Sequence, residues 1–504
     1  MNKGNTEIIF GPPGTGKTTR LLTIAESFFE AGYAPRDICF VTFTRKGATE
    51  AKSRAIAKFQ LDDNDLCWWR TLHSLAFSQL GLSRHQVMGF ADYCTICGHL
   101  GLSITNRGMS EDGTISGLSK GDRLFFTENM ARAQKMSLRE YWEANAQEDI
   151  YWYELELLHN TLLQYKAANG KSDFTDIIYM FNHTPVAPNI KMLIVDEAQD
   201  LTPLQWEMVE HLSTDAEKVF IAGDDDQAIF KWAGADVNRF ISLPGRQIVL
   251  PRSYRVPIAV QNVAEQIANR ISNRVSKTWQ PTAEQGEVTY INNLEELDMS
   301  EGSWLLLARN LFLLEQFTQH CMQMGYVYDS SIGSPIRGSS MTAIRTWEEL
   351  RKGNTVHATD VKKIYDLMTV KEKVKYGFKS KVDKLPDTQL LTLEQLKNDY
   401  GLLTDKIWHE ALDKIDIQER EYFIAALRRG EKLLREPRIK IQTIHSVKGG
   451  EADHVVLATD MAHRTWQEFQ ENEDDEHRVW YVAVTRARKT LAIVSPTTDR
   501  FYTI

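Results

Sequence analysis

The sequence is poor in cysteine and has no long apolar run, and each absence excludes a class of protein. Five cysteines in 504 residues are too few for a disulfide-stabilised secreted fold, so we expect a reducing compartment. No segment approaches the roughly 18 consecutive apolar residues that suggest a membrane span. The first ten residues, MNKGNTEIIF, lack the apolar stretch and cleavage site of a secretory signal. We therefore expect a soluble, cytoplasmic protein with no membrane partner.

An excess of positive charge is also absent. Lysine and arginine total 59 against 68 aspartates and glutamates, a formal net charge of −9. This balance does not exclude a nucleic-acid partner, because phosphate binding depends on local basic patches. The composition is otherwise that of a globular protein, and the length predicts three or four domains.

A structural zinc site is not expected. Cys94 and Cys97 form a C-x-x-C pair with His99 nearby. A structural zinc ion needs four ligands, however, and no second pair follows at the usual distance. We expect two ordinary buried thiols.

Short apolar runs alternate with helical patterns in two regions of the chain. The first region contains EIIF, ICFVTF, KMLIVDEAQD and EKVFIAGDDDQ, and the second contains GEVTYI, SWLLLAR, MGYVYD, RIKIQTIHS, DHVVLATD and KTLAIVSP. Such alternation predicts parallel sheets covered by helices. Each region is interrupted by a helical, charged segment, the first of which includes the loop-like stretch TNRGMSEDGTISGLSKGD.

The predicted fold class is therefore α/β, with two parallel-sheet domains that each carry a helical insertion. The first domain is expected at 1–82 and 166–245, with its insertion at 83–165. The second is expected at 246–334 and 438–504, with its insertion at 335–437.

A phosphate-binding loop is expected between the first strand and the first helix. GPPGTGKT, from Gly11 to Thr18, matches G-x-x-x-x-G-K-[ST] in that context. Its backbone N–H groups and the following helix N-terminus would hold nucleotide phosphates. Lys17 would reach the β and γ phosphates, and Thr18 would hold Mg²⁺. The expected nucleotide-binding residues of the loop are Gly11, Gly14, Thr15, Gly16, Lys17, Thr18 and Thr19.

An acidic pair follows a later apolar strand. LIVDEAQD places Asp196 and Glu197 at the carboxyl end of that strand, where α/β sheets bind ligands. Asp196 would hold Mg²⁺, and Glu197 would orient or deprotonate the attacking water. Such a pair can also be a helix N-cap, but the upstream phosphate loop favours the catalytic interpretation. Hydrolysis is then expected to depend on Mg²⁺.

These motifs belong to an ordered set. The others are VTFTRKGATEAKSR, RTLHSLAF, DFTDII, GDDDQAIFKWAGAD, SYR, IQTIHSVKGGEADHVV and EHRVWYVAVTRAR. Through them the chain resembles the UvrD/Rep/PcrA-like branch of superfamily 1 DNA helicases, of bacterial or phage type. The resemblance implies two RecA-like domains, with ATP in the cleft between them and single-stranded DNA across their top. It also implies the cytoplasm of a bacterium or an infected host.

The resemblance implies roles for individual residues. Gln227 would contact the γ-phosphate or the water, and Arg255 and Arg486 of the second domain would be paired arginine fingers. The implied catalytic residues are Lys17, Glu197, Gln227, Arg255 and Arg486. Tyr254 would stack on adenine, and Glu451 would line the nucleotide site. The implied DNA-contacting residues are Phe43, Thr44, Arg45, Thr71, His73, Phe230, Trp232, Thr443 and His445.

Simpler interpretations stay open for these positions. Phe230 and Trp232 would stack on bases, which is worth ~1–3 kcal/mol per base and tolerates any sequence; the alternative is that they are core residues. The remaining DNA-contacting positions could be satisfied turn or surface residues. The lysine-rich stretch between Lys362 and Lys384 could touch a duplex or be a solvated helical face.

The sequence also departs from the family pattern. Relatives carry a segment before the phosphate loop whose glutamine reads adenine, whereas only MNKGNTEIIF precedes it here, so we expect weaker selectivity for ATP. Ala233 stands where arginine is frequent, and Ser253 where asparagine is frequent. Gly450 replaces an aliphatic residue.

The expected function is ATP-dependent movement on single-stranded DNA, with 3′ to 5′ polarity implied by the resemblance, coupled to duplex unwinding. The expected partners are single-stranded DNA and single-strand/duplex junctions, with replication or repair proteins possible and a monomer as the active form. Two alternatives remain, a translocase that displaces proteins with little unwinding and an ATP-gated nucleic-acid clamp. RNA is a further possible substrate.

Overall fold

The computed structural model describes residues 4–105, 119–145, 149–433 and 435–504. Most of the loop expected around 105–122 lies outside the described residues. The chain forms two compact units, one of Met1–Glu284 with Asn472–Val482 and the other of Gln285–Glu471 with Ala483–Ile504. Among the described residues, no helix has both the length and the apolar character that crossing a membrane requires.

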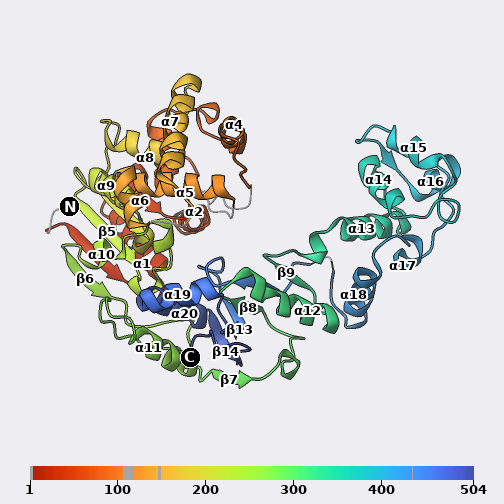
Figure 1. Ribbon diagram of the computed structural model, residues 1–504. Helices are drawn as coiled ribbons and strands as arrows, with labels where there is room; N and C mark the ends of the chain where they lie inside the picture. The colour runs from red at the N-terminus through yellow and green to blue at the C-terminus, as the bar shows by residue number, and fades with distance from the viewer. Residues whose placement is uncertain (1–3, 106–118, 146–148, 434) are drawn as a thin grey trace. The chain divides into compact units, whose positions relative to one another are not determined.

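The first unit is built on a six-stranded sheet in the order β3-β2-β4-β5-β1-β6, of which β5 and β6 are labelled in Figure 1. Every neighbouring pair in it is parallel. The strands are β1 (Thr6–Phe10), β2 (Ile38–Thr42), β3 (Trp69–Thr71), β4 (Met192–Asp196), β5 (Lys218–Gly223) and β6 (Arg246–Val249). The helices are α1 (Lys17–Glu30), α2 (Arg45–Phe59), α3 (Leu72–Gln79), α8 (Phe174–Asn182), α9 (Pro203–Leu212), α10 (Val237–Ile241), α11 (Ile258–Ala268) and α20 (Glu473–Val484), whose residues up to Val482 belong to this unit.

Both faces of this sheet are buried. Successive residues of a strand point to opposite faces, so Ile9 and Phe40 pack with α1 and α2 on one face. Ile8 and Val41 pack with α3, α8 and α9 on the other. The strands are apolar throughout because both faces are covered, as is usual in parallel sheets.

The first insertion is helical and has its own core. Its helices are α4 (Phe90–Leu100), α5 (Lys120–Ala133), α6 (Leu138–Ala144) and α7 (Trp152–Asn169). Ile96, Leu124 and Leu158 are among the buried residues of that core. The expectation of two buried thiols is wrong for one of them, because Cys97 is buried but Cys94 is exposed. The pair lies on α4 only three positions apart, and Cys94 falls outside the face that packs.

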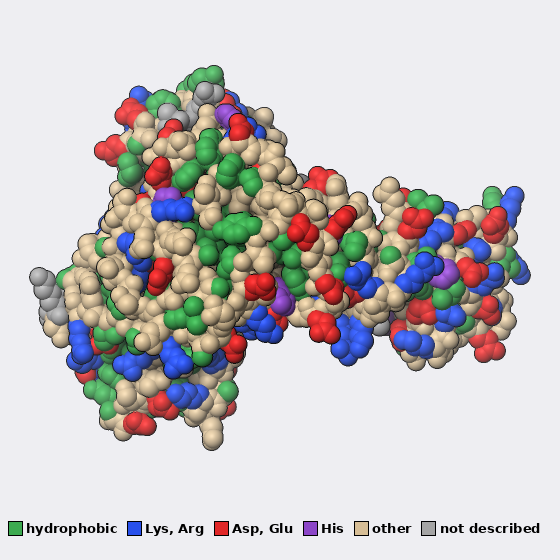
Figure 2. All heavy atoms as spheres, turned by 90° about the horizontal axis from the view of Figure 1, so that it is seen from below, with side chains coloured by type: hydrophobic (Ala, Val, Ile, Leu, Met, Phe, Trp, Pro, Cys, Tyr) green, Lys and Arg blue, Asp and Glu red, His purple; other side chains and the backbone are tan. Residues whose placement is uncertain are grey.

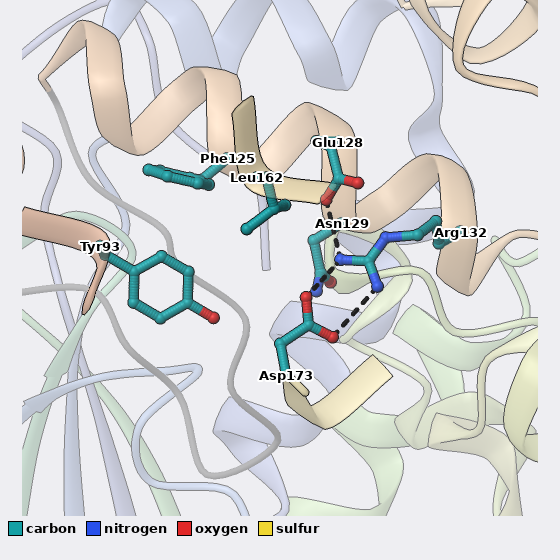
Figure 3. A pocket seen from close by; sticks show the side chains of 7 residues that line it. All are labelled: Tyr93, Phe125, Glu128, Asn129, Arg132, Leu162 and Asp173. Atoms are coloured by element: carbon teal, nitrogen blue, oxygen red, sulfur yellow. Dashed lines mark hydrogen bonds and ion pairs between the residues drawn. The ribbon is translucent and has the colours of Figure 1, made fainter. Parts of the chain in front are cut away.

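A buried ion-pair cluster joins this insertion to α8 (Figure 3). Arg132 of α5 contacts Glu128 at 2.8 Å and Asp173, the N-cap of α8, at 2.7 Å. Lys166 of α7 contacts Asp173 at 2.5 Å. Burial alone would raise the pKa of Asp173, but the charges of Arg132 and Lys166 hold it well below its usual range. The cluster is therefore charged and internally paired.

The second unit contains another six-stranded sheet, in the order β7-β14-β13-β8-β12-β9, and all its pairs are parallel. The strands are β7 (Glu287–Ile291), β8 (Trp304–Ala308), β9 (Tyr328–Ser330), β12 (Ile439–Thr443), β13 (Ala452–Ala458) and β14 (Ala487–Val494), and the helices outside the insertion are α12 (Glu315–Met324) and α19 (His463–Glu471). The prediction of two parallel-sheet α/β domains with helical insertions is confirmed.

The second insertion is mostly helical but also contains a short antiparallel strand pair. Its elements are α13 (Ser339–Arg351), β10 (Val356–His357), α14 (Ala358–Asp366), α15 (Phe378–Asp383), β11 (Leu390–Leu391), α16 (Leu393–Asp399), α17 (Trp408–Ala411) and α18 (Ile417–Arg428). Its buried residues, such as Trp347 and Phe423, are continuous with the core of the second sheet.

The boundary between the units differs from the predicted one. The prediction ended the first domain at residue 245, whereas β6 pairs with β1 in the first sheet and the first unit extends to Glu284. The start of α20 also belongs to it, because Asp474 accepts hydrogen bonds from the backbone N–H groups of Ser272 and Asn273 at 2.7 and 3.0 Å. An apolar run shows that a strand forms but does not show which sheet edge it joins.

Candidate nucleotide and DNA site

All six strands of the first sheet run in the same direction, so their carboxyl ends share one edge. A predicted site segment follows each strand there. These segments are the phosphate loop after β1, Phe43–Arg45 after β2, Thr71–His73 at β3, Asp196–Glu197 at β4, Gly223–Asp236 at β5 and Ser253–Arg255 after β6. The segments expected to bind DNA at β2 and β3 lie toward one side of the sheet, and most of those expected to bind nucleotide lie toward the other.

The phosphate loop is shaped around its glycines. Gly14 and Gly16 have φ of +72° and +77°, a region that glycine adopts without strain. A Cβ at Gly11 would lie 2.0 Å from Cγ of Lys17. Lys17 Nζ donates to the Gly11 carbonyl at 3.0 Å, so the lysine ammonium lies over the loop at the place where phosphate oxygens would be held. The loop residues fit a nucleotide phosphate.

The two left-handed glycines provide a prediction. A Cβ at Gly14 would lie 2.4 Å from Arg255 Cβ and 2.8 Å from Ser253 Oγ, whereas at Gly16 the nearest atom is 3.8 Å away. Gly16→Ala should cost only the backbone penalty of about 1–2 kcal/mol, and Gly14→Ala should cost clearly more. Urea unfolding without nucleotide measures both variants. Equal losses would show that the chain after β6 does not pack against Gly14.

The two residues expected to hold Mg²⁺ meet between α1 and β4. Thr18 Oγ1 donates to Asp196 Oδ2 at 3.0 Å. Burial, followed by the charge of Glu197, raises the pKa of Asp196 to about 6, so an additional positive charge nearby would favour the ionised carboxylate. An oxygen-ligated cation such as Mg²⁺ would supply that charge. The hydroxyl and the carboxylate fit the expected metal.

Glu197 adopts a strained backbone conformation beside this pair. Its φ of 54° and ψ of 39° are left-handed, which costs a residue with a Cβ about 1–2 kcal/mol. Its Oε1 lies 3.9 Å from Lys17 Nζ. The strained conformation places a carboxylate next to the phosphate-binding lysine, and such strain concentrates at functional sites.

Gln199 connects Glu197 to the next strand, and no local pattern in the sequence distinguishes it from its neighbours. Gln199 is fully buried. Its Nε2 donates to Glu197 Oε2 at 2.6 Å, and its Oε1 accepts from the backbone N–H of Asp224 at 3.0 Å. A Cβ at Gly223 would lie 2.5 Å from that Oε1, so glycine is required there. The side chain thus fixes Glu197 relative to the loop after β5.

The loop after β5 positions Gln227 through its own first aspartate. Gln227 Nε2 donates to Asp224 Oδ2 at 2.7 Å, and its backbone N–H donates to the Asp224 carbonyl at 2.9 Å. Asp224 is fully buried and Gln227 is nearly so. Glu197, Gln199, Asp224 and Gln227 therefore form one chain of hydrogen bonds along the sheet edge.

The segment after β6 packs on the phosphate loop. Ser253 is fully buried, and its Oγ donates to the Pro13 carbonyl at 2.7 Å. The Tyr254 backbone N–H donates to the Gly14 carbonyl at 2.9 Å, and the Tyr254 side chain is 75% exposed. The expectation that the second domain supplies Arg255 needs correction, because these contacts place Arg255 in the first unit, next to the phosphate loop.

Aromatic rings form a row at the other end of the loop. Phe230 lies 5.8 Å from Phe43 and 6.4 Å from Trp232, measured between ring centroids. Phe126 of α5 continues the row, stacked 6.4 Å from Trp232 with an interplanar angle of 16°. Trp232 is 48% exposed, so it is not a core residue. Phe126 lies in no motif, and only the structure shows its place in the row.

Two of the other expected DNA-contacting residues have structural hydrogen bonds. Thr44 caps α2 by accepting from the Gly47 N–H at 3.1 Å, and Thr71 caps α3 by accepting from the Ser74 N–H at 3.3 Å. Arg45 is exposed in the first turn of α2. His73 packs edge-on against Phe174, 5.7 Å away. For Thr44 and Thr71, helix capping accounts for the residue type.

Four expected site residues belong to the second unit. Thr443 ends β12, and His445 follows it. Arg486 is almost fully buried and donates from Nη1 to the Gly450 carbonyl at 3.2 Å. Glu451 lies 3.5 Å from Arg488. The other expected residues all belong to the first unit.

The lysine-rich stretch of the second insertion is partly neutralised. Lys362 contacts Asp387 and Lys363 contacts Asp360, each at 2.8 Å. Acidic and basic side chains are interspersed over the face that Figure 2 shows. These pairs favour the interpretation of a solvated helical face over that of a duplex-binding patch.

Comparison with known proteins identifies relatives. A family model of the UvrD/REP helicase N-terminal domain matches residues 2–246, and one of the UvrD-like helicase C-terminal domain matches residues 346–497. The ATP-dependent DNA helicase PcrA of Staphylococcus aureus (strain Mu50) is 24% identical over 316 residues, covering 58% of this chain and 42% of the relative. The ATP-dependent DNA helicase Rep of Buchnera aphidicola subsp. Baizongia pistaciae is 25% identical over 290 residues, covering 52% and 40%.

The chain spans less than half the length of these curated relatives. A solved structure of arterivirus nonstructural protein 10, a helicase, covers 98% of this chain and 60% of its own, with a TM-score of 0.33 and 10% identity. That likeness is too low to bear on the fold.

Proposed function

Because the chain belongs to the UvrD/Rep family of helicases, we propose that it is an ATP-driven motor that moves along single-stranded DNA. In this proposal it moves 3′ to 5′ and couples hydrolysis of Mg²⁺-bound ATP to duplex unwinding. The relatives PcrA and Rep are both named ATP-dependent DNA helicases, which supports DNA as the substrate.

The observation that carries the proposal is the loop Gly223–Asp236. One end of the loop is hydrogen-bonded to the Glu197 network through Gln199. Its other end presents Phe230 and Trp232 in the aromatic row. In a DNA motor, ATP turnover must depend on whether DNA is bound. Here a single short loop contacts both the candidate nucleotide site and the candidate DNA site.

The residues of the first unit suggest how hydrolysis proceeds. Lys17 and the backbone of its loop would bind the phosphates, and Thr18 and Asp196 would hold Mg²⁺, which would neutralise charge on the phosphate oxygens. Glu197 would accept the proton of the attacking water. Gln199 holds the Glu197 carboxylate in place, and Gln227 would orient the water from the adjacent loop.

One observation favours a second candidate. Some lysines of the second insertion are paired with aspartates, which makes the lysine-rich stretch less suited to bind duplex DNA. A translocase that displaces proteins from single strands with little unwinding would not need to bind a duplex there.

The proposal is tested by ATP turnover with and without single-stranded DNA, together with unwinding of duplexes that carry a 3′ or a 5′ tail. We expect strong stimulation by DNA and unwinding of the 3′-tailed duplex only. Stimulation without unwinding would select the translocase. An unstimulated ATPase would reject the motor and leave the ATP-gated clamp, and equal stimulation by RNA would widen the substrate.

A further inference from the structure

Three consecutive carboxylates are completely buried in the loop after β5. Asp224, Asp225 and Asp226 have no exposed surface, and neither does the side chain of Lys277, which lies among them. Isolated charges are costly to bury, so such groups occur only when they are paired. The pairing in this cluster links parts of the first unit that are distant in sequence.

Lys277 contacts all three carboxylates. Its Nζ lies 3.1 Å from Asp224 Oδ1 and 2.9 Å from Asp226 Oδ2, and it is hydrogen-bonded to Asp225. Burial alone would lower the pKa of Lys277, but the three carboxylates raise it above its usual range. The lysine is therefore a fixed positive charge at the centre of the loop.

Arg274 adds a second cation from the same segment. Its Nε and Nη2 donate to the two oxygens of Asp226 at 2.8 and 2.6 Å, a bidentate geometry that fixes orientation as well as charge. The backbone N–H of Val275 donates to Asp225 Oδ2 at 2.8 Å. Residues 274–277 thus hold each member of the buried acidic triplet.

The same segment continues to the phosphate loop. The Gln280 N–H donates to the Pro251 carbonyl, and the Gln280 carbonyl accepts from the Ser253 N–H, both at 2.8 Å. Ser253 in turn donates to the Pro13 carbonyl. Hydrogen bonds, together with the backbone from Lys277 to Gln280, therefore connect the loop that carries Gln227, Phe230 and Trp232 to the loop that would bind ATP.

Stability alone is a poor reason for this cluster. Buried ion pairs are often no more stabilising than well-packed apolar side chains of the same volume, and their best-attested use is to specify one arrangement. The arrangement specified here is that of Asp224, which accepts the hydrogen bond of the Gln227 side chain.

We propose that Lys277 is a positioning residue that makes ATP turnover respond to DNA. Lys277 holds Asp224 and Asp226 in place. When DNA binding moves the aromatic rings of Phe230 and Trp232, the rigid loop therefore moves Gln227 and the phosphate loop together with them. Lys277 itself touches neither the nucleotide nor the DNA. The inference rests on the proposed function, because it requires an ATPase that DNA stimulates.

The test is Lys277→Met in the full chain, which keeps the length of the side chain and removes its charge. We expect the KM for ATP to stay close to that of the wild type, because the phosphate loop is intact. The DNA-stimulated kcat should fall by about 10²-fold, the size of effect that a displaced catalytic group produces. The basal kcat should fall less, so that the ratio of stimulated to basal turnover approaches one.

The matched control is Lys166→Met. Lys166 is also a buried lysine between two carboxylates, 2.5 Å from Asp173 and 2.7 Å from Asp176, so its loss tests the general effect of an unpaired buried charge. Its stimulation ratio should match that of the wild type. If Lys277→Met does not fold, Lys277→Met/Asp225→Asn leaves fewer unpaired carboxylates and gives the same measurement.

The ratio separates the outcomes, because it does not depend on the fraction of active protein. A Lys277 variant with lower stability and a wild-type ratio would make the lysine merely structural and overturn the inference. A wild-type protein that DNA does not stimulate would overturn both this inference and the proposed function. A stimulated wild type with an unchanged variant would overturn the inference alone.

Discussion

Replacing Glu197 with glutamine should lower the DNA-stimulated kcat for ATP by about 10²–10⁴-fold, the usual contribution of a positioned general base. Glutamine keeps the shape of the side chain and can still accept the hydrogen bond that Gln199 donates at 2.6 Å. It also tolerates the left-handed backbone no worse than glutamate does. The change therefore removes the basic oxygen and leaves the geometry in place. ATP binding should persist, because Lys17 and its loop are unchanged.

The measurement is steady-state ATP turnover with saturating single-stranded DNA, together with nucleotide binding at equilibrium. Glu217→Gln is the matched control, because Glu217 is an exposed glutamate of the same unit that precedes β5 at the opposite end of the strand. It should behave as the wild type does. A Glu197 variant that binds ATP and keeps its kcat would assign the proton transfer to another group.

Removing the aromatic rings of the loop should weaken DNA binding without weakening nucleotide binding. Each base–aromatic stack is worth ~1–3 kcal/mol, so Trp232→Ala should weaken affinity for single-stranded DNA by about 5- to 150-fold, and Phe230→Ala by a similar factor. Trp232 is 48% exposed, so its loss leaves little cavity. The ATP concentration at half-maximal basal turnover should stay unchanged.

Fluorescence anisotropy of a labelled oligonucleotide measures these affinities, and the basal ATPase shows that the variants fold. Tyr290→Ala removes a more accessible ring, 65% exposed on β7 of the second unit, and should leave DNA affinity unaltered. Wild-type affinity in both loop variants would mean that the DNA does not run along the row. A double variant, Phe230→Ala/Trp232→Ala, should lose more affinity than either single variant, but its loss need not equal their sum because the two rings are neighbours.

The sheets and the phosphate loop could be predicted because their signals are local. The apolar runs of β1 and β4 identify these strands, and the rule that ligands bind at the carboxyl ends of parallel strands places the motifs along one edge. The three-residue strand β3 has no such run, and it is visible only through its pairing with β2. β6 has the run, but its sheet is decided by pairing with β1.

The supporting residues could not be predicted because their signals are not local. Gln199 accepts a hydrogen bond from the backbone of Asp224, and Lys277 forms ion pairs with three aspartates about fifty positions earlier in the chain. A single lysine in a polar segment carries no pattern that points to such a partner. Phe126 belongs to the first insertion and extends the aromatic row, but the sequence around it predicts only an ordinary helix. Motifs gave the residues expected to touch ligands, and only the fold shows those that hold them.

The contact between the start of α20 and the segment after α11 bears on how the protein is made. The Ser272 and Asn273 N–H groups are capped by Asp474, and Arg478 donates to the carbonyls of Asp225 and Asn273. A ribosome reaches these partners only after it has synthesised the whole of the second insertion. The acidic loop of the first unit is therefore completed late in translation, and a fragment that ends at Glu284 would expose backbone groups that the full chain pairs. A shortened form of the protein should therefore retain residues 472–482.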